Sequence, residues 1–66
     1  MIEPLNVREL QILRRAANGL TYQQTADELK LKAETVRKYA VVMLERMDAR
    51  NIAHAVAIGL REGIIT

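Results

Sequence analysis

The chain has 66 residues, of which 50% are hydrophobic, 3% aromatic and 27% charged, and its formal net charge is +2. With no cysteine and one histidine, the sequence excludes a disulfide framework, a thiolate zinc site and a histidine-rich metal cluster. No apolar run approaches the ~20 residues of a membrane span, and the apolar content argues against disorder. A core this small leaves little room for a shielded pocket, so we expect neither an enzyme nor a cofactor. The composition favours one small cytoplasmic domain, stabilised by a partner or a second copy.

Apolar residues recur at three- and four-residue spacing, with only one proline and three glycines, so the sequence predicts an all-α fold of four helices. The first helix is expected over residues 7–18. Asn6 suits its N-cap, Glu9 stands at capping-box spacing, and Gly19 suits the left-handed position after its end. Its expected apolar face consists of Leu10, Ile12, Leu13, Ala16 and Ala17.

The second helix is expected over residues 22–29, with Thr21 and Gln24 as a second capping box. After a turn at residues 30–32, the third is expected over 33–47, and Asn51 caps a fourth over 52–62. Inward positions of the second helix are Thr25, Ala26 and Leu29. In the third, the core stripe is expected to be Val36, Ala40, Met43 and Met47, which fall within a ~60° arc at ~100° per residue.

A short helix, a three-residue turn and a longer helix are typical of the helix-turn-helix, although an ordinary helical hairpin has the same outline. Ala26 is the small residue that lets two helices cross closely. Apolar residues stand at the other positions expected to face inward, namely Leu29, Leu31, Val36 and Tyr39.

Several short segments share one family pattern: L-N-V-R-E at residues 5–9, G-L-T at 19–21, Ala26 with Leu29, T-V-R at 35–37, Met43, Arg46 and Met47, R-N at 50–51, A-V at 55–56, and Gly63. In these the sequence resembles the DNA-binding domain of the LuxR family, found also in regulators of the NarL, FixJ and GerE kind. The resemblance implies a tri-helical core and a C-terminal dimerisation helix. The departures from the family pattern are Thr25, Lys32, Tyr39, Asp48 and Gly59, where Ile, Ser, His, Gly and Ala are usual.

Base contacts are expected from the face of the third helix opposite the core stripe, which holds Glu34, Arg37, Lys38, Val41 and Glu45. The resemblance implies that Arg37, Lys38 and Val41 touch bases. Arg37 can bind the guanine O6 and N7 edge, and Val41 can contact a thymine methyl or be a scattered exposed residue. Lys38 can bind a base or a phosphate. Glu34 can accept from a cytosine amine, or pair with Lys38 four residues on.

Phosphate contacts are expected from the start of the second helix, the turn and the start of the third. Free backbone amides at the start of a helix form an anion site. Hydroxyl and ammonium groups add to it, although the two lysines can equally belong to a solvated turn. The expected contacts are Thr21, Tyr22, Gln23, Lys30, Lys32 and Thr35.

Glu9 falls inside the apolar arc of the first helix, so its carboxylate needs partners. A capping bond from the Asn6 amide is one candidate and an ion pair with Arg46 is another. His54, on the polar side of the fourth helix, is expected to be solvated or to act as a cap; we expect no metal site.

Apolar residues of the fourth helix spread over roughly 220° at ~100° per residue, more than a single core requires. Ile52, Val56 and Gly59 are expected to face the core. The apolar surface of the fourth helix that does not face the core suggests a homodimer, which the resemblance also implies. The alternatives are that this surface is tolerated as exposed or is covered by residues 1–5. The expected dimer face consists of Ala53, Ala57, Ile58 and Leu60.

The favoured hypothesis is a transcription regulator whose third helix reads an operator in double-stranded DNA and which recruits or excludes RNA polymerase. It would be cytoplasmic and nucleoid-associated, with no membrane partner. A sigma-factor promoter-binding region has the same helix-turn-helix but normally lacks the fourth helix. The alternative class is an interaction module or inhibitor that binds a larger regulator or polymerase subunit through its apolar C-terminal helix. If the 66 residues are the whole product, the domain stands alone without a sensor.

Overall fold

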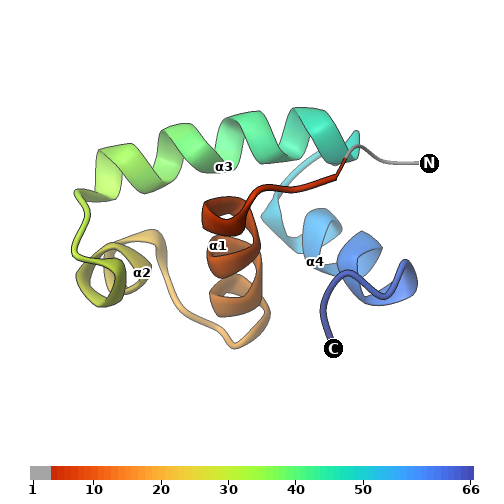
Figure 1. The fold of residues 1–66 in the computed structure, drawn as a ribbon, viewed down its shortest axis with the longest axis horizontal. Helices are drawn as coiled ribbons and strands as arrows, with labels where there is room; N and C mark the ends of the chain where they lie inside the picture. Colours follow the sequence, from red (N-terminus) through yellow and green to blue (C-terminus); the bar gives the residue numbers. More distant parts are fainter. Residues whose placement is uncertain (1–3) are drawn as a thin grey trace.

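The computed structural model describes residues 4–66 and contains four helices: α1 (Val7–Ala17), α2 (Tyr22–Leu29), α3 (Ala33–Met47) and α4 (Ile52–Arg61). In Figure 1, α3 spans one side of the molecule, while α2, α1 and α4 lie beneath it. Helix α1 contacts each of the other three helices. The all-α fold class is confirmed, and only the carboxyl ends of α1 and α4 fall one residue short of the expected bounds.

The starts of three helices carry the side-chain caps expected from the sequence. The Asn6 Oδ1 atom accepts from the Glu9 amide at 2.8 Å, and the Glu9 carboxylate accepts from the Asn6 amide at 3.1 Å. Thr21 and Gln24 form the same reciprocal pair at the start of α2. At α4, the Asn51 side chain accepts from the His54 amide at 2.8 Å. The N-cap residue of α3 is Lys32, which makes no side-chain cap bond, as expected where a lysine replaces a capping residue.

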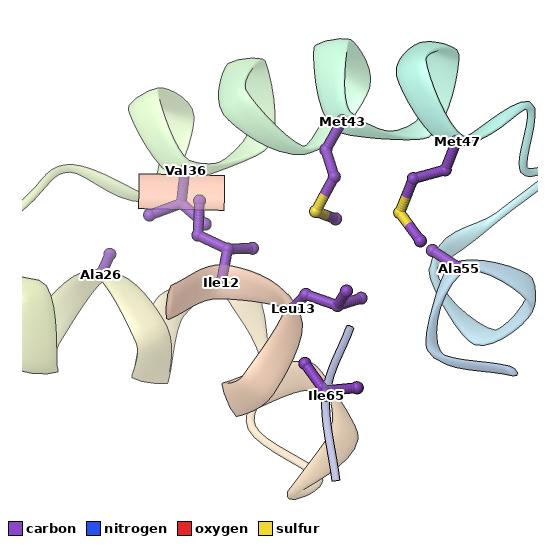
Figure 2. Packing of buried hydrophobic residues seen from close by; sticks show 8 residues of the cluster. All are labelled: Ile12, Leu13, Ala26, Val36, Met43, Met47, Ala55 and Ile65. Carbon is purple, nitrogen blue, oxygen red and sulfur yellow. The ribbon is translucent and has the colours of Figure 1, made fainter. Parts of the chain in front are cut away.

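The hydrophobic core lies between α3 and the three helices beneath it, and Figure 2 shows its members pointing toward one another. The expected stripe of α3 is buried along its whole length, including Ala40. The chain after α4 turns back and inserts Ile65 beside α1, a contribution that the sequence analysis did not predict. The buried cluster consists of Ile12, Leu13, Ala26, Val36, Met43, Met47, Ala55 and Ile65.

Two expected core positions, Ala17 and Tyr39, were wrong. Ala17, at the carboxyl end of α1, is exposed. Tyr39 is 37% exposed, because it lies on the flank of α3 and not on the core stripe. In α4 the expected core-facing residues are confirmed: Gly59 is buried, and Ile52 and Val56 are half-buried and pack against the core cluster. Ala55 is buried as well.

Gly59 permits the close approach of α4 to α1 and to the C-terminal segment. A Cβ atom at this position would lie 3.1 Å from both Ile65 Cγ1 and Leu13 Cδ2. Even an alanine therefore requires these neighbours to move by a few tenths of an ångström. The glycine that replaces the usual alanine of the family pattern thus matches the tight packing around it.

Asp48 ends α3 in the left-handed region, with φ of 53°, where a non-glycine residue costs roughly 1–2 kcal/mol. Its carboxylate also lies at the negative end of the helix dipole. We expect Asp48→Gly to stabilise the domain by about 1 kcal/mol and raise Tm by roughly 4–8 °C. Asp48→Ala is the matched control, because it removes the charge and keeps the strain. Thermal unfolding followed by circular dichroism measures both; equal Tm values for the two variants would contradict the strain argument.

Candidate nucleic-acid interface

A tight turn between α2 and α3 presents α3 to solvent. Lys30 adopts the left-handed conformation, with φ of 59°, and the Leu31 amide donates to the Ala26 carbonyl at 2.8 Å. Ala26 is fully buried, which allows α2 to cross close to α3, and Leu31 packs against the core. The turn therefore holds α3 with its core stripe inward and the opposite face outward, as in a helix-turn-helix.

The outer face of α3 brings the four candidate base-contacting residues together around one shallow hollow, lined by Glu34, Arg37, Lys38 and Val41. All four side chains are exposed. Within residues 4–66, Arg37 makes no hydrogen bond or ion pair, and its guanidinium is therefore available to a ligand. Lys38 Nζ lies 3.9 Å from Glu34 Oε1, and because both side chains are more than three-quarters exposed, this pair is weak.

The candidate phosphate-contacting residues divide into two groups. Thr21, Gln23, Lys30 and Lys32 are exposed, but the Thr21 hydroxyl already accepts from the Gln24 amide and Gln23 Nε2 donates to Asp27 Oδ1 at 3.0 Å. Neither lysine forms an ion pair in the part of the chain that the structure describes. Tyr22 and Thr35 are half-buried, and Tyr22 also packs against the core.

A buried carboxylate connects α1 to α3. Glu9 is 1% exposed; besides its capping bond, its Oε2 atom lies 3.4 Å from Arg46 Nε near the end of α3. Both partners anticipated for Glu9 are therefore present. A buried carboxylate is costly unless it is hydrogen-bonded and paired, and the Glu9 carboxylate satisfies both conditions only when Asn6 and Arg46 keep their positions. The pair thus helps to set the angle at which α3 crosses α1, and with it the direction of the outer face.

The outward side of α4 carries three of the four residues expected at a dimer interface. Ala53 and Leu60 are exposed, Leu60 to 52%, and Ala57 is half-buried. Ile58, the fourth, is half-buried and packs against the core cluster on the side of Ala55. Of residues 1–5, considered as a cover for this face, residues 1–3 lie outside the described residues. His54 acts as a cap, since its Nδ1 accepts from the Arg50 amide at 3.0 Å.

Residues 3–58 match the family described as bacterial regulatory proteins, luxR family. The chain belongs to this family. Over 62 residues it is 40% identical to the uncharacterized transcriptional regulatory protein YvfU of Bacillus subtilis strain 168, covering 94% of this chain and 31% of that protein. It is 33% identical over 60 residues to the transcriptional regulatory protein DesR of the same organism, covering 91% of this chain and 30% of DesR. The chain thus spans about three-tenths of the length of these curated relatives.

Membership of the luxR family and the four-helix arrangement together identify a helix-turn-helix, DNA-binding domain of transcription regulators. No helix within residues 4–66 has the length and apolar character needed to cross a membrane. The flank of α3 around Tyr39 and Arg46 was not among the predicted binding residues. The signal for it was the spacing of Thr35, Tyr39, Val42 and Arg46, which follow one another at four, three and four residues along one helix side.

Proposed function

We propose that this luxR-family domain binds a specific sequence in double-stranded DNA, with α3 in the major groove, and regulates transcription from that site. The observation that carries the proposal is the hollow on the outer face of α3. There a guanidinium, an ammonium, a carboxylate and an apolar side chain gather on one exposed surface. These are the side-chain types that read base edges in a major groove.

Each of the four residues has a role set by its chemistry. Arg37 donates in bidentate fashion to a guanine, while Lys38 contacts a neighbouring base or phosphate. The methyl groups of Val41, which is 52% exposed, contact a thymine methyl. Glu34 accepts from a cytosine amine, for which it gives up its weak pair with Lys38.

Phosphate contacts come from the surface beside α3. Lys30 and Lys32 lie in the turn, both exposed. The start of α2 adds the Tyr22 and Gln23 amides, which precede the first intrahelical bonds, and the start of α3 adds Thr35. Tyr22 reaches a phosphate with its hydroxyl only, since its ring packs against the core.

Two copies pair through the α4 face formed by Ala53, Ala57 and Leu60. A two-fold dimer places two recognition helices one DNA turn apart, about 34–36 Å, and matches an inverted pair of half-sites. Such a regulator acts in the cytoplasm at the nucleoid, and occupancy of its site recruits or excludes RNA polymerase.

Salt dependence of binding tests this proposal. Fluorescence anisotropy with duplex DNA should show log K falling linearly with log salt, because phosphate contacts release counterions. Lys32→Gln should reduce that slope by about 0.9 and weaken all sequences alike. The matched control is Arg14→Gln, which removes one positive charge from the exposed last turn of α1. An affinity that does not change with salt, or equal slopes for the two variants, would contradict the assignment.

The exposed Leu60 favours a second candidate function, that of an interaction module that binds another protein through α4. It predicts that Arg37 and Lys38 are dispensable for function while Leu60 is essential. Absence of duplex binding by the wild-type chain at low salt would favour it.

A further inference from the structure

A second hollow lies along one flank of α3, between its outer face and its core stripe; we call it the flank hollow. Its α3 residues stand three or four positions apart, which places them on one side of the helix. Asn6, at the start of α1, forms the opposite wall. Besides Glu9, the lining residues are Asn6, Thr35, Lys38, Tyr39, Val42 and Arg46.

The polar groups of the flank hollow are mainly hydrogen-bond donors. Thr35 and Tyr39 supply hydroxyls, and Lys38 and Arg46 supply positive charge. Glu9 is the one carboxylate in the lining; it is 1% exposed, and its two oxygens are engaged by the Asn6 amide and Arg46 Nε. The flank hollow therefore combines positive charge with donors and offers an anion no exposed carboxylate of its own.

These donors are available to a ligand. Within residues 4–66, no side-chain hydrogen bond uses Thr35, Tyr39 or Arg46. The Arg46 side chain is 38% exposed although its Nε atom faces Glu9. Because that pair fixes one edge of the guanidinium against α1, the arginine is held in place before any ligand arrives. A donor held in this way loses little entropy on binding.

The flank hollow is continuous with the outer face of α3, because Lys38 lines both hollows. When the outer face enters a major groove, the flank of the helix faces a groove wall, and that wall is made of phosphates. We propose that the flank hollow holds a backbone phosphate of the strand beside α3, contacted by the Tyr39 hydroxyl and the Arg46 guanidinium together with Thr35. This inference rests on the proposed function and adds a phosphate contact to those expected from the turn lysines.

Val42 allows a test that leaves the donors intact. Its side chain lines the flank hollow, is apolar and is 44% exposed, so polar replacements should fold. We compare Val42→Lys, Val42→Glu and the uncharged reference Val42→Gln by anisotropy on one duplex. An added phosphate contact steepens the salt slope by about 0.9. Val42→Lys should therefore bind roughly threefold or more tightly than Val42→Gln, and Val42→Glu correspondingly more weakly.

The control is the same series at Ala17, which is exposed at the end of α1 farthest from α3 in Figure 1. Charges there should change affinity far less. Tyr39→Phe removes only the hydroxyl and should weaken binding several-fold, to the same extent on every operator variant. Circular dichroism establishes that each variant is folded.

The inference is overturned if the affinities of the Val42 variants differ no more than those of the Ala17 variants. It is also overturned if Tyr39→Phe binds DNA as tightly as the wild type does. Val42 variants that bind DNA equally but lose transcriptional activity would assign the flank hollow to a protein partner, and would also overturn it. A wild-type chain that binds no duplex at all would instead refute the proposed function.

Discussion

Leu60→Glu is expected to lower the affinity for a duplex carrying two half-sites by about 100-fold or more, while affinity for a single half-site stays within about twofold. Leu60 is 52% exposed on the α4 face shared with Ala53 and Ala57. In a two-fold dimer this face is self-complementary, so the substitution places two carboxylates at one interface. Without pairing, the second half-site no longer benefits from an effective concentration set by the first.

Val7→Glu is the matched control for Leu60→Glu. Val7 is 73% exposed in the first turn of α1, and the same charge change there lies outside the α4 face. Sedimentation of protein with each duplex separates one bound copy from two. If Leu60→Glu still places two copies on the paired site with unchanged affinity, α4 does not form the dimer interface.

Arg37→Ala is expected to cost about 1–3 kcal/mol of binding, roughly a 5- to 150-fold loss, on the preferred operator. The reason is the loss of a bidentate contact from a guanidinium that has no partner within residues 4–66. The loss should be confined to one base pair of each half-site, so the variant discriminates less at that position.

Arg37→Lys separates the geometry of this contact from its charge. Lysine keeps the positive charge but lacks the planar fork, so most of the specificity should still be lost. Anisotropy on a set of single-base operator variants measures both changes. A uniform loss across all of them would assign Arg37 to a phosphate.

Where neighbouring residues decide the structure, the sequence was sufficient. The Asn6–Glu9 and Thr21–Gln24 boxes depend on a three-residue spacing, and the core stripe of α3 depends on helical periodicity alone. The partner of Glu9 was also predictable, because a carboxylate on an apolar arc requires a cation and Arg46 lies at the edge of the facing stripe.

Apart from the Glu9–Arg46 pair, contacts between segments that are distant in the sequence were not predictable from it. Ile65 is buried because the chain turns back after α4. Helical periodicity does not predict the path of the chain beyond the end of a helix. Ile65 lies against Gly59, where a Cβ atom would approach Ile65 Cγ1 to 3.1 Å, and this close contact is not contained in the pattern of either segment. In α4, Ile58 packs against the core while Leu60 is exposed.

The flank of α3 was missed for a related reason. Helical periodicity divides α3 into an inner stripe and an outer face, and Tyr39 was assigned inward because it stands at an apolar position of the helix-turn-helix pattern. The flank hollow exists only because Asn6 and Glu9, from the start of α1, meet that side of α3. Such a meeting depends on the crossing of two helices that are remote in sequence.

Selection of bound fragments from random duplex DNA tests whether the outer face of α3 reads a base sequence. We predict one enriched motif made of two inverted half-sites, about 10–10.5 base pairs from centre to centre. Recovered fragments with no shared motif, bound with the salt dependence of a non-specific polycation, would contradict the claim.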